Sequence, residues 1–112
     1  MIRFIIAFLL CAVSVFAADI TGTWSFEVVT DAGSGTPKFV FKQEGEKLTG
    51  TYSGQLGEAK VTGTVKGQEV TFSFDIGAAV VYQGHIDESG KKITGNCDIA
   101  GQATGTFTGT RQ

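Results

Sequence analysis

Two tyrosines, Tyr52 and Tyr82, are the side chains best suited to binding chemistry, because a phenol joins an apolar ring to a hydrogen-bonding hydroxyl. Each lies at an apolar position of a stretch in which apolar and polar residues alternate, so both are expected to point inward. Phe39, Phe74 and Cys97 occupy equivalent positions on neighbouring stretches. We expect these five residues to form a binding site, in which the two phenols orient the polar atoms of a ligand.

The residues that usually carry catalysis are few and scattered. His85 is the only histidine and is predicted on the outer face of a strand, without a partner for a metal site or a catalytic triad. Asp75 and Asp98 are also predicted to face outward and Asp87-Glu88 to lie in a turn, so no carboxylate pair is buried for acid–base catalysis. The Gly33-Ser34-Gly35 segment lacks the lysine and the following helix of a phosphate-binding loop. The sequence therefore predicts that the protein is not an enzyme and holds no metal or cofactor.

Residues 1–17 are predicted to be a secretory signal peptide. Arg3 supplies a positive charge, an apolar run follows from Phe4 to Phe16, and Ala17 ends a cleavage site. An apolar run of about 13 residues is too short to span a bilayer. We therefore expect cleavage, a single mature domain of residues 18–112, a secreted or periplasmic location, and no membrane attachment afterwards.

The charge and the cysteines of the mature chain narrow its function. Cleavage leaves eight basic and eleven acidic residues, a net charge of −3, and no cluster of basic and aromatic residues that would bind nucleic acid. Cys11 would leave with the signal peptide, so Cys97 can form no disulfide within the chain. It could pair between chains, although its apolar position favours a buried thiol. A small exported domain without a disulfide must gain stability by closing its own sheet.

The mature sequence predicts an all-β fold, a closed antiparallel up-and-down barrel of eight strands. No segment has helical periodicity, and turn residues recur roughly every 8–12 positions. Closing the meander removes its two exposed edges. The outward residues are mostly polar or charged, which argues against an outer-membrane barrel. The predicted strands are residues 21–29, 36–43, 47–54, 58–66, 69–76, 79–87, 91–99 and 102–110.

A pattern of an apolar residue, threonine, glycine and a small polar residue recurs along these strands. Its copies are residues 20–23, 48–51, 61–64, 93–96, 103–106 and 107–110. Alternation places the glycines on the inner face, near the waist of the barrel. Two outcomes are open: rings such as Phe26, Phe41 and Phe72 fill the space beside the glycines, or a cavity remains there beneath Tyr52 and Tyr82.

The two ends of the predicted barrel differ in their turns. One end carries charged turns at residues 43–47, 66–69 and 87–91. The turns of the other end, called the mouth end below, are nearly uncharged and lie at residues 31–35, 54–57, 77–79 and 100–102. Weakly polar loops are typical of a binding mouth or a contact surface, so we expect any ligand to enter there.

Gly22-Thr23-Trp24 in the first strand and Arg111 after the last resemble the signature of the calycins, which include lipocalins, fatty-acid-binding proteins and avidins. The resemblance implies an eight-stranded barrel with Trp24 packed at the closed end under Arg111, within reach of a cation–π contact.

Residues 20–24 and 48–52 are most similar to the first and third strands of avidins, and this likeness implies that Tyr52 contacts a ligand. Phe26 and Gly54 stand where the avidin pattern has asparagine and serine, and the stacking indoles are missing. The sequence therefore does not predict a biotin pocket.

Together these patterns predict an exported, non-catalytic barrel that binds a small apolar ligand at its mouth end. The alternative is a protein-interaction module, such as a periplasmic protease inhibitor, that acts through residues 30–36, 54–58, 76–79 and 99–102. A purely structural barrel is a third interpretation.

Overall fold

The computed structural model describes residues 19–112, so the predicted signal peptide lies outside the described residues. The described chain forms strands only. They are β1 (Gly22–Thr30), β2 (Gly33–Gly35), β3 (Lys38–Glu44), β4 (Lys47–Gly54), β5 (Gly57–Lys66), β6 (Glu69–Asp75), β7 (Ala79–Ile86), β8 (Lys92–Ile99) and β9 (Ala103–Arg111). Within this part of the chain there is no helix long and apolar enough to cross a membrane.

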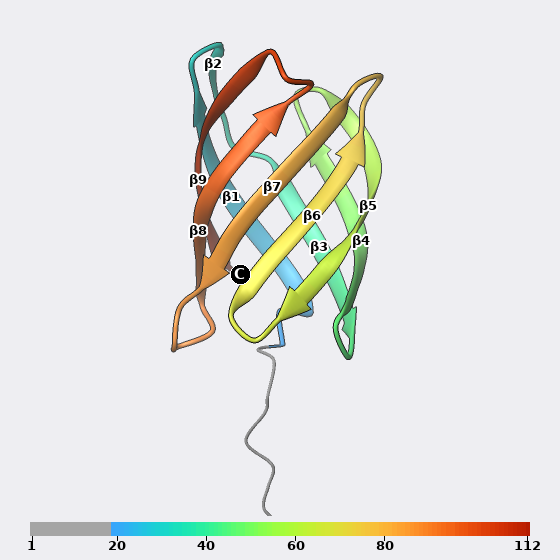
Figure 1. Ribbon diagram of the computed structural model, residues 1–112, viewed down its shortest axis with the longest axis vertical. Helices are drawn as coiled ribbons and strands as arrows, with labels where there is room; N and C mark the ends of the chain where they lie inside the picture. Colours follow the sequence, from blue (N-terminus) through green and yellow to red (C-terminus); the bar gives the residue numbers. More distant parts are fainter. Residues whose placement is uncertain (1–18) are drawn as a thin grey trace, which may run out of the picture.

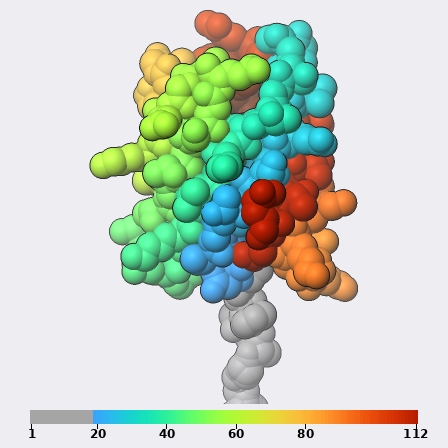
Figure 2. Space-filling view, turned by 180° about the vertical axis from the view of Figure 1, so that it is seen from behind, coloured from blue at the N-terminus to red at the C-terminus, as the bar shows by residue number. Residues whose placement is uncertain are grey.

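Eight of the strands close into the antiparallel up-and-down barrel that the sequence predicts (Figure 1). β1 pairs with β3, each strand from β3 to β8 pairs with the next one in the chain, and β9 returns to pair with β1 from Trp24↔Arg111 to Thr30↔Gly105. Seen from behind, blue β1 lies between β3 and the red C-terminal strand (Figure 2). The closing ladder removes the exposed edges, and the prediction of the fold class is confirmed.

One predicted strand has different bounds. The predicted strand at residues 36–43 begins at Lys38, and the chain before it forms the short strand β2, which pairs with the end of β1. Pro37 has no N–H to donate, although its carbonyl oxygen accepts the N–H of Phe26 at 3.0 Å. The end of β1 and β2 therefore form a short hairpin arm, residues 28–37, that extends beyond the rim of the mouth end (Figure 1).

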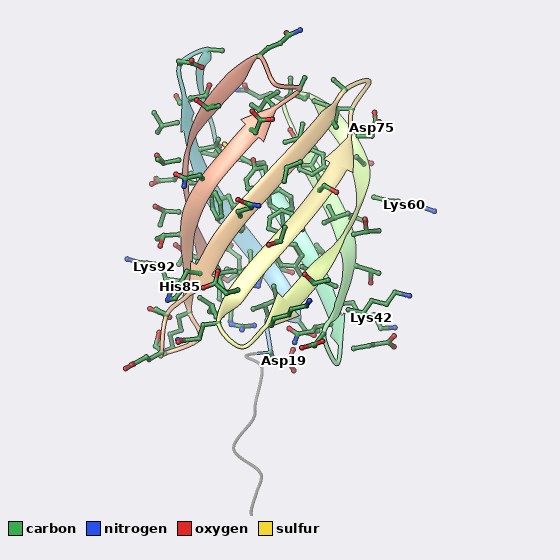
Figure 3. The ribbon with its side chains drawn as sticks, viewed as in Figure 1. Asp19, Lys42, Lys60, Asp75, His85 and Lys92 are labelled. Atoms are coloured by element: carbon green, nitrogen blue, oxygen red, sulfur yellow. The ribbon has the colours of Figure 1, made fainter. Side chains whose placement is uncertain are left out.

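The buried side chains lie on the inner face that alternation predicts, and Ile20, just before β1, joins them. Phe39 is the hub of this core, since its ring lies within 5.8 Å of the rings of six other aromatic residues, and Phe26 lies within 6.2 Å of five. Phe26 and Phe107 stack at 5.2 Å. Charged side chains such as Lys42, Lys60 and Lys92 project outward from the barrel (Figure 3).

Rings and neighbouring strands fill the waist of the barrel, so of the two outcomes that the sequence left open the filled waist is the one observed. A Cβ atom added at Gly84 would lie 2.7 Å from Phe107 Cζ, and one added at Gly109 would lie 2.7 Å from Phe26 Cδ1. Beside Gly63 the added atom would overlap with Phe72. The space that a side chain would need at these glycines is thus taken by residues of nearby strands, among them the register partners Phe72 and Phe26.

Arg111 and Trp24 close the end opposite the mouth. Arg111 Cζ lies 4.8 Å from the centre of the Trp24 ring. The same guanidinium donates hydrogen bonds to the carbonyl oxygens of Gly90, Thr21 and Asp19 at 3.1, 2.8 and 2.7 Å. Asp19 lies at this lower end and Asp75 near the mouth (Figure 3). One side chain therefore ties the last strand to the segment that enters the first.

Candidate functional site

A cavity of about 430 Å³ opens at the mouth end of the barrel. It lies between the hairpin arm, the turn after β4 and the turn after β8. No side chain that lines it is an acid, a base or a histidine. Its lining residues are Val28, Thr30, Ala32, Gly33, Ser34, Gly35, Thr36, Pro37, Tyr52, Gln55, Leu56, Tyr82, Ile99, Gln102 and Ala103.

Space for the cavity is left by β2, whose two residues on the inner face of the arm are glycines. Strand alternation places Gly33, Gly35 and Pro37 on that face, in line with Phe39 further along the chain. A Cβ atom at Gly35 would have only Gln55 Oε1 within 4 Å, at 3.8 Å. Gly33 has φ +132°, a conformation that other residues rarely adopt. The arm therefore covers the mouth without filling it.

The two predicted phenols, Tyr52 and Tyr82, both line this cavity, and their side chains are almost fully buried, with relative exposures of 4% and 3%. Tyr52 stacks on Phe74 at 4.3 Å, and Tyr82 lies 5.9 Å from the same ring. Phe39 lies 5.4 Å from Tyr52 and 5.6 Å from Tyr82. Phe39 and Phe74 thus support both phenols from the core, and neither lines the cavity itself.

Neither phenol hydroxyl has a hydrogen-bond partner among residues 19–112. A buried hydroxyl without a partner costs about 1–3 kcal/mol, so two such groups at one cavity point to a polar atom that is supplied from outside. Burial raises the pKa of Tyr82 well above its ordinary value, and nearby Cys97 and Tyr52 raise it further. Tyr82 is therefore a neutral hydroxyl that is available to donate a hydrogen bond.

The raised pKa of Tyr82 makes the stability of the barrel sensitive to alkali. An unfolded tyrosine ionises near pH 10, whereas Tyr82 keeps its proton in the folded state, so the folded state binds more protons above that pH. The stabilisation is complete below about pH 10 and is lost as the pH rises through the folded-state pKa.

We expect the free energy of unfolding to fall above about pH 10. In the Tyr82→Phe variant this decrease should be smaller, because the contribution of Tyr82 is absent. At neutral pH the variant should be as stable as the wild type, or up to about 1 kcal/mol more stable, because it removes an unpaired hydroxyl. Urea unfolding of both proteins between neutral and alkaline pH measures this. Identical alkaline profiles would contradict the prediction.

Cys97, the fifth predicted site residue, is buried and forms no disulfide within residues 19–112. It pairs across the sheet with Tyr82 and with Gly105, and its thiol does not reach the mouth cavity. Burial raises the pKa of this thiol, and the charge of Asp98 adds to the effect. Cys97 is therefore part of the wall behind Tyr82.

The other polar residues considered for chemistry serve the turns and the outer surface. Asp75 accepts the N–H of Gly77, and Asp98 accepts the N–H of Gly101. His85 Nδ1 lies 3.3 Å from an exposed carboxylate oxygen of Glu69. Among the described residues no group of three or more His, Cys, Asp and Glu side chains could hold a metal ion.

A second depression, of about 680 Å³, lies on the outer face of β7 to β9. Outward residues such as Gln83, Asn96 and Thr106 line it. It is a shallow, open surface without a buried hydroxyl that lacks a partner. The mouth cavity is thus the candidate binding site, because two buried hydroxyls without a hydrogen-bond partner lie beside it.

The cavity lies at the end of the barrel where the sequence predicts the site, but the prediction did not include the β2 residues that line it. Gly33, Gly35 and Pro37 alternate with polar residues, which is the signal of a strand with an inner face. The density of glycine and serine in residues 31–35 instead predicted an irregular loop. Ile99, expected only as a core residue, also lines the cavity.

Comparisons with known proteins support the fold alone. No protein-family model matches the chain, and no curated protein sequence is significantly similar to it. Among solved structures, the redesigned β-barrel b11L5F_LGL is similar with a TM-score of 0.65 and 17% sequence identity, over 83% of this chain and 91% of that one. The redesigned β-barrel mFAP0, bound to DFHBI, has a TM-score of 0.60 and 18% identity, over 82% of this chain and 98% of that one.

Proposed function

We propose that the protein is an exported, non-catalytic barrel that binds a small, largely apolar ligand in the cavity at its mouth end. The observation that carries the proposal is the pair of buried hydroxyls, on Tyr52 and Tyr82, that lack partners at the edge of a cavity without charged side chains. Such a site binds a ligand through apolar contact and uses its few polar groups to orient it.

The size of the cavity and the fold of a neighbour support this proposal. A volume of about 430 Å³ falls within the range usual for small-molecule pockets, roughly 300–1,000 Å³. The redesigned barrel mFAP0 has a similar fold and was solved bound to DFHBI. The resemblance of Gly22-Thr23-Trp24 and Arg111 to the calycin signature favours the same kind of function.

Export is proposed from the sequence of the first 17 residues. Their charge, apolar run and cleavage site resemble those of a signal peptide. A secreted or periplasmic barrel would meet its ligand outside the cytoplasm.

The Gly35→Val substitution tests whether the cavity is the binding site. The new side chain would enter the cavity, where a Cβ atom has only Gln55 Oε1 within 4 Å, and the backbone of Gly35 does not require glycine. We expect the wild type to bind the neutral fluorescent probe N-phenyl-1-naphthylamine saturably, and the variant to bind it at least about tenfold more weakly, a loss of about 1.4 kcal/mol. Fluorescence titration measures both affinities.

Ser53→Val is the matched control, because Ser53 is exposed, faces outward on β4 beside Tyr52 and does not line the cavity. It introduces the same side chain without narrowing the cavity, so its affinity should equal that of the wild type. Absence of saturable binding to the wild type, or an equal loss in the two variants, would contradict the proposed site. Retention of the barrel in each variant is checked by circular dichroism.

A further inference from the structure

The polar groups of the mouth cavity are sharply limited in kind. Thr30 already uses its hydroxyl, which donates to Gly33 O at 2.8 Å and accepts the N–H of Ala32 at 3.0 Å. The other polar side chains of the lining, those of Ser34, Thr36, Gln55 and Gln102, belong to exposed residues at the rim. The polar groups available at depth are therefore the hydroxyls of Tyr52 and Tyr82.

The cavity also offers nothing to neutralise a charge. No Lys, Arg or His lines it, and none of its lining residues is an acid. The acids of the surrounding turns are directed elsewhere: Asp31 accepts the N–H of Thr104, and Asp98 accepts that of Gly101. An ion that enters would lose its water without gaining an opposite charge, which is costly in an apolar site.

We infer that the polar group of the ligand is an uncharged hydrogen-bond acceptor of the carbonyl type, held by the hydroxyls of Tyr52 and Tyr82, and not a carboxylate. This inference rests on the proposed function, since it concerns the same cavity. A carbonyl oxygen carries two lone pairs and can accept hydrogen bonds from two donors. Both tyrosines line the same cavity and their rings lie 4.3 and 5.9 Å from Phe74, so one bound ligand can contact both of them.

The environment of Tyr82 supports the neutral form of the ligand. Burial is the largest cause of its raised pKa, which means that the site disfavours a negative charge on the phenol oxygen. The same burial opposes the entry of an anionic ligand. A neutral acceptor is favoured over an anion, because each hydroxyl then gains a hydrogen-bond partner at little desolvation cost.

Three probes that share a naphthalene ring test the inference: 2-ethylnaphthalene, 2-acetylnaphthalene and 2-naphthoate. Their affinities are measured at neutral pH by displacement of N-phenyl-1-naphthylamine from the full mature protein. We expect the ketone to bind at least about tenfold more tightly than the hydrocarbon, and the carboxylate to bind most weakly. In the Tyr52→Phe/Tyr82→Phe double variant the advantage of the ketone over the hydrocarbon should disappear.

The outcomes separate the inference from the proposed function. Equal binding of ketone and hydrocarbon, tighter binding of 2-naphthoate, or an advantage of the ketone that persists in the double variant would each overturn the inference while leaving a binding cavity. Failure of all three probes and of N-phenyl-1-naphthylamine to bind the wild type would overturn the proposed function and the inference with it. The double variant keeps both rings, so its core packing is retained and its fold can be checked independently.

Discussion

Replacing Gly105 by alanine is expected to destabilise the barrel by about 3 kcal/mol or more, one of the largest effects of any single methyl group in this chain. An added Cβ atom there would overlap with the backbone carbonyl oxygen of Val29 on the paired strand β1. A side chain could rotate away, but a backbone group can move only if the ladder that closes the barrel opens. Urea unfolding followed by circular dichroism measures the loss.

Gly35→Ala is the matched control for this substitution. Gly35 is also a strand glycine with an inward position, but its added Cβ atom would have one neighbour within 4 Å, at an ordinary contact distance of 3.8 Å. Because alanine also reduces the entropy of the unfolded chain, this variant should be neutral or more stable by about 0.4–1 kcal/mol. If the two variants unfold at the same urea concentration, backbone contact at Gly105 does not limit the fold.

Replacing Arg111 by alanine is expected to lower the free energy of unfolding by about 2–4 kcal/mol. The change removes hydrogen bonds to the carbonyl oxygens of Gly90, Thr21 and Asp19, together with the contact over the Trp24 ring. It leaves those carbonyls at the surface, where water replaces part of the loss. The cost therefore falls below that of three fully buried bonds.

Arg111→Lys separates the charge from the geometry of the guanidinium. Lysine can keep a cation over Trp24, but its single ammonium cannot reach three carbonyls that diverge from one planar fork. We expect it to recover less than half of the loss, as measured by thermal unfolding and by the fluorescence of Trp24. Full recovery with lysine would mean that charge alone holds the closed end, contrary to the prediction.

Alternation was sufficient to predict the barrel because almost every inward position carries either an apolar side chain or glycine. The remaining predicted strands begin and end within one residue of their observed bounds, whereas the second begins at Lys38, after Pro37, and the predicted turn before it contains β2. A proline inside a strand removes one donor but leaves the register intact, since Ser25↔Lys38 and Val28↔Gly35 follow the same pairing. Turn-forming residues in the sequence cannot distinguish a strand that is interrupted by proline from a loop.

The cavity was harder to predict than the fold because it depends on which glycines meet a ring. Gly84 and Gly109 face Phe107 and Phe26, whereas Gly35 faces open space. All three occupy inward positions in the sequence pattern, and only the three-dimensional packing separates them. Tyr52 and Tyr82 were recognised from their chemistry, but the β2 residues that line the same cavity were not.

The residues that stabilise the barrel differ from most of the residues that would contact a ligand, and the hairpin arm belongs largely to the second group. The aromatic core lies below the cavity, while β2, which pairs only with β1 and contributes Gly33 and Gly35 to the inner face, lines the cavity from the hairpin arm. Substitutions at Gly35 or Gln55 would reshape the site without disturbing the ring cluster around Phe26. Related barrels that differ at these positions can therefore prefer different ligands while they keep the same core, and a protein designer can change the ligand preference by substitutions in the arm.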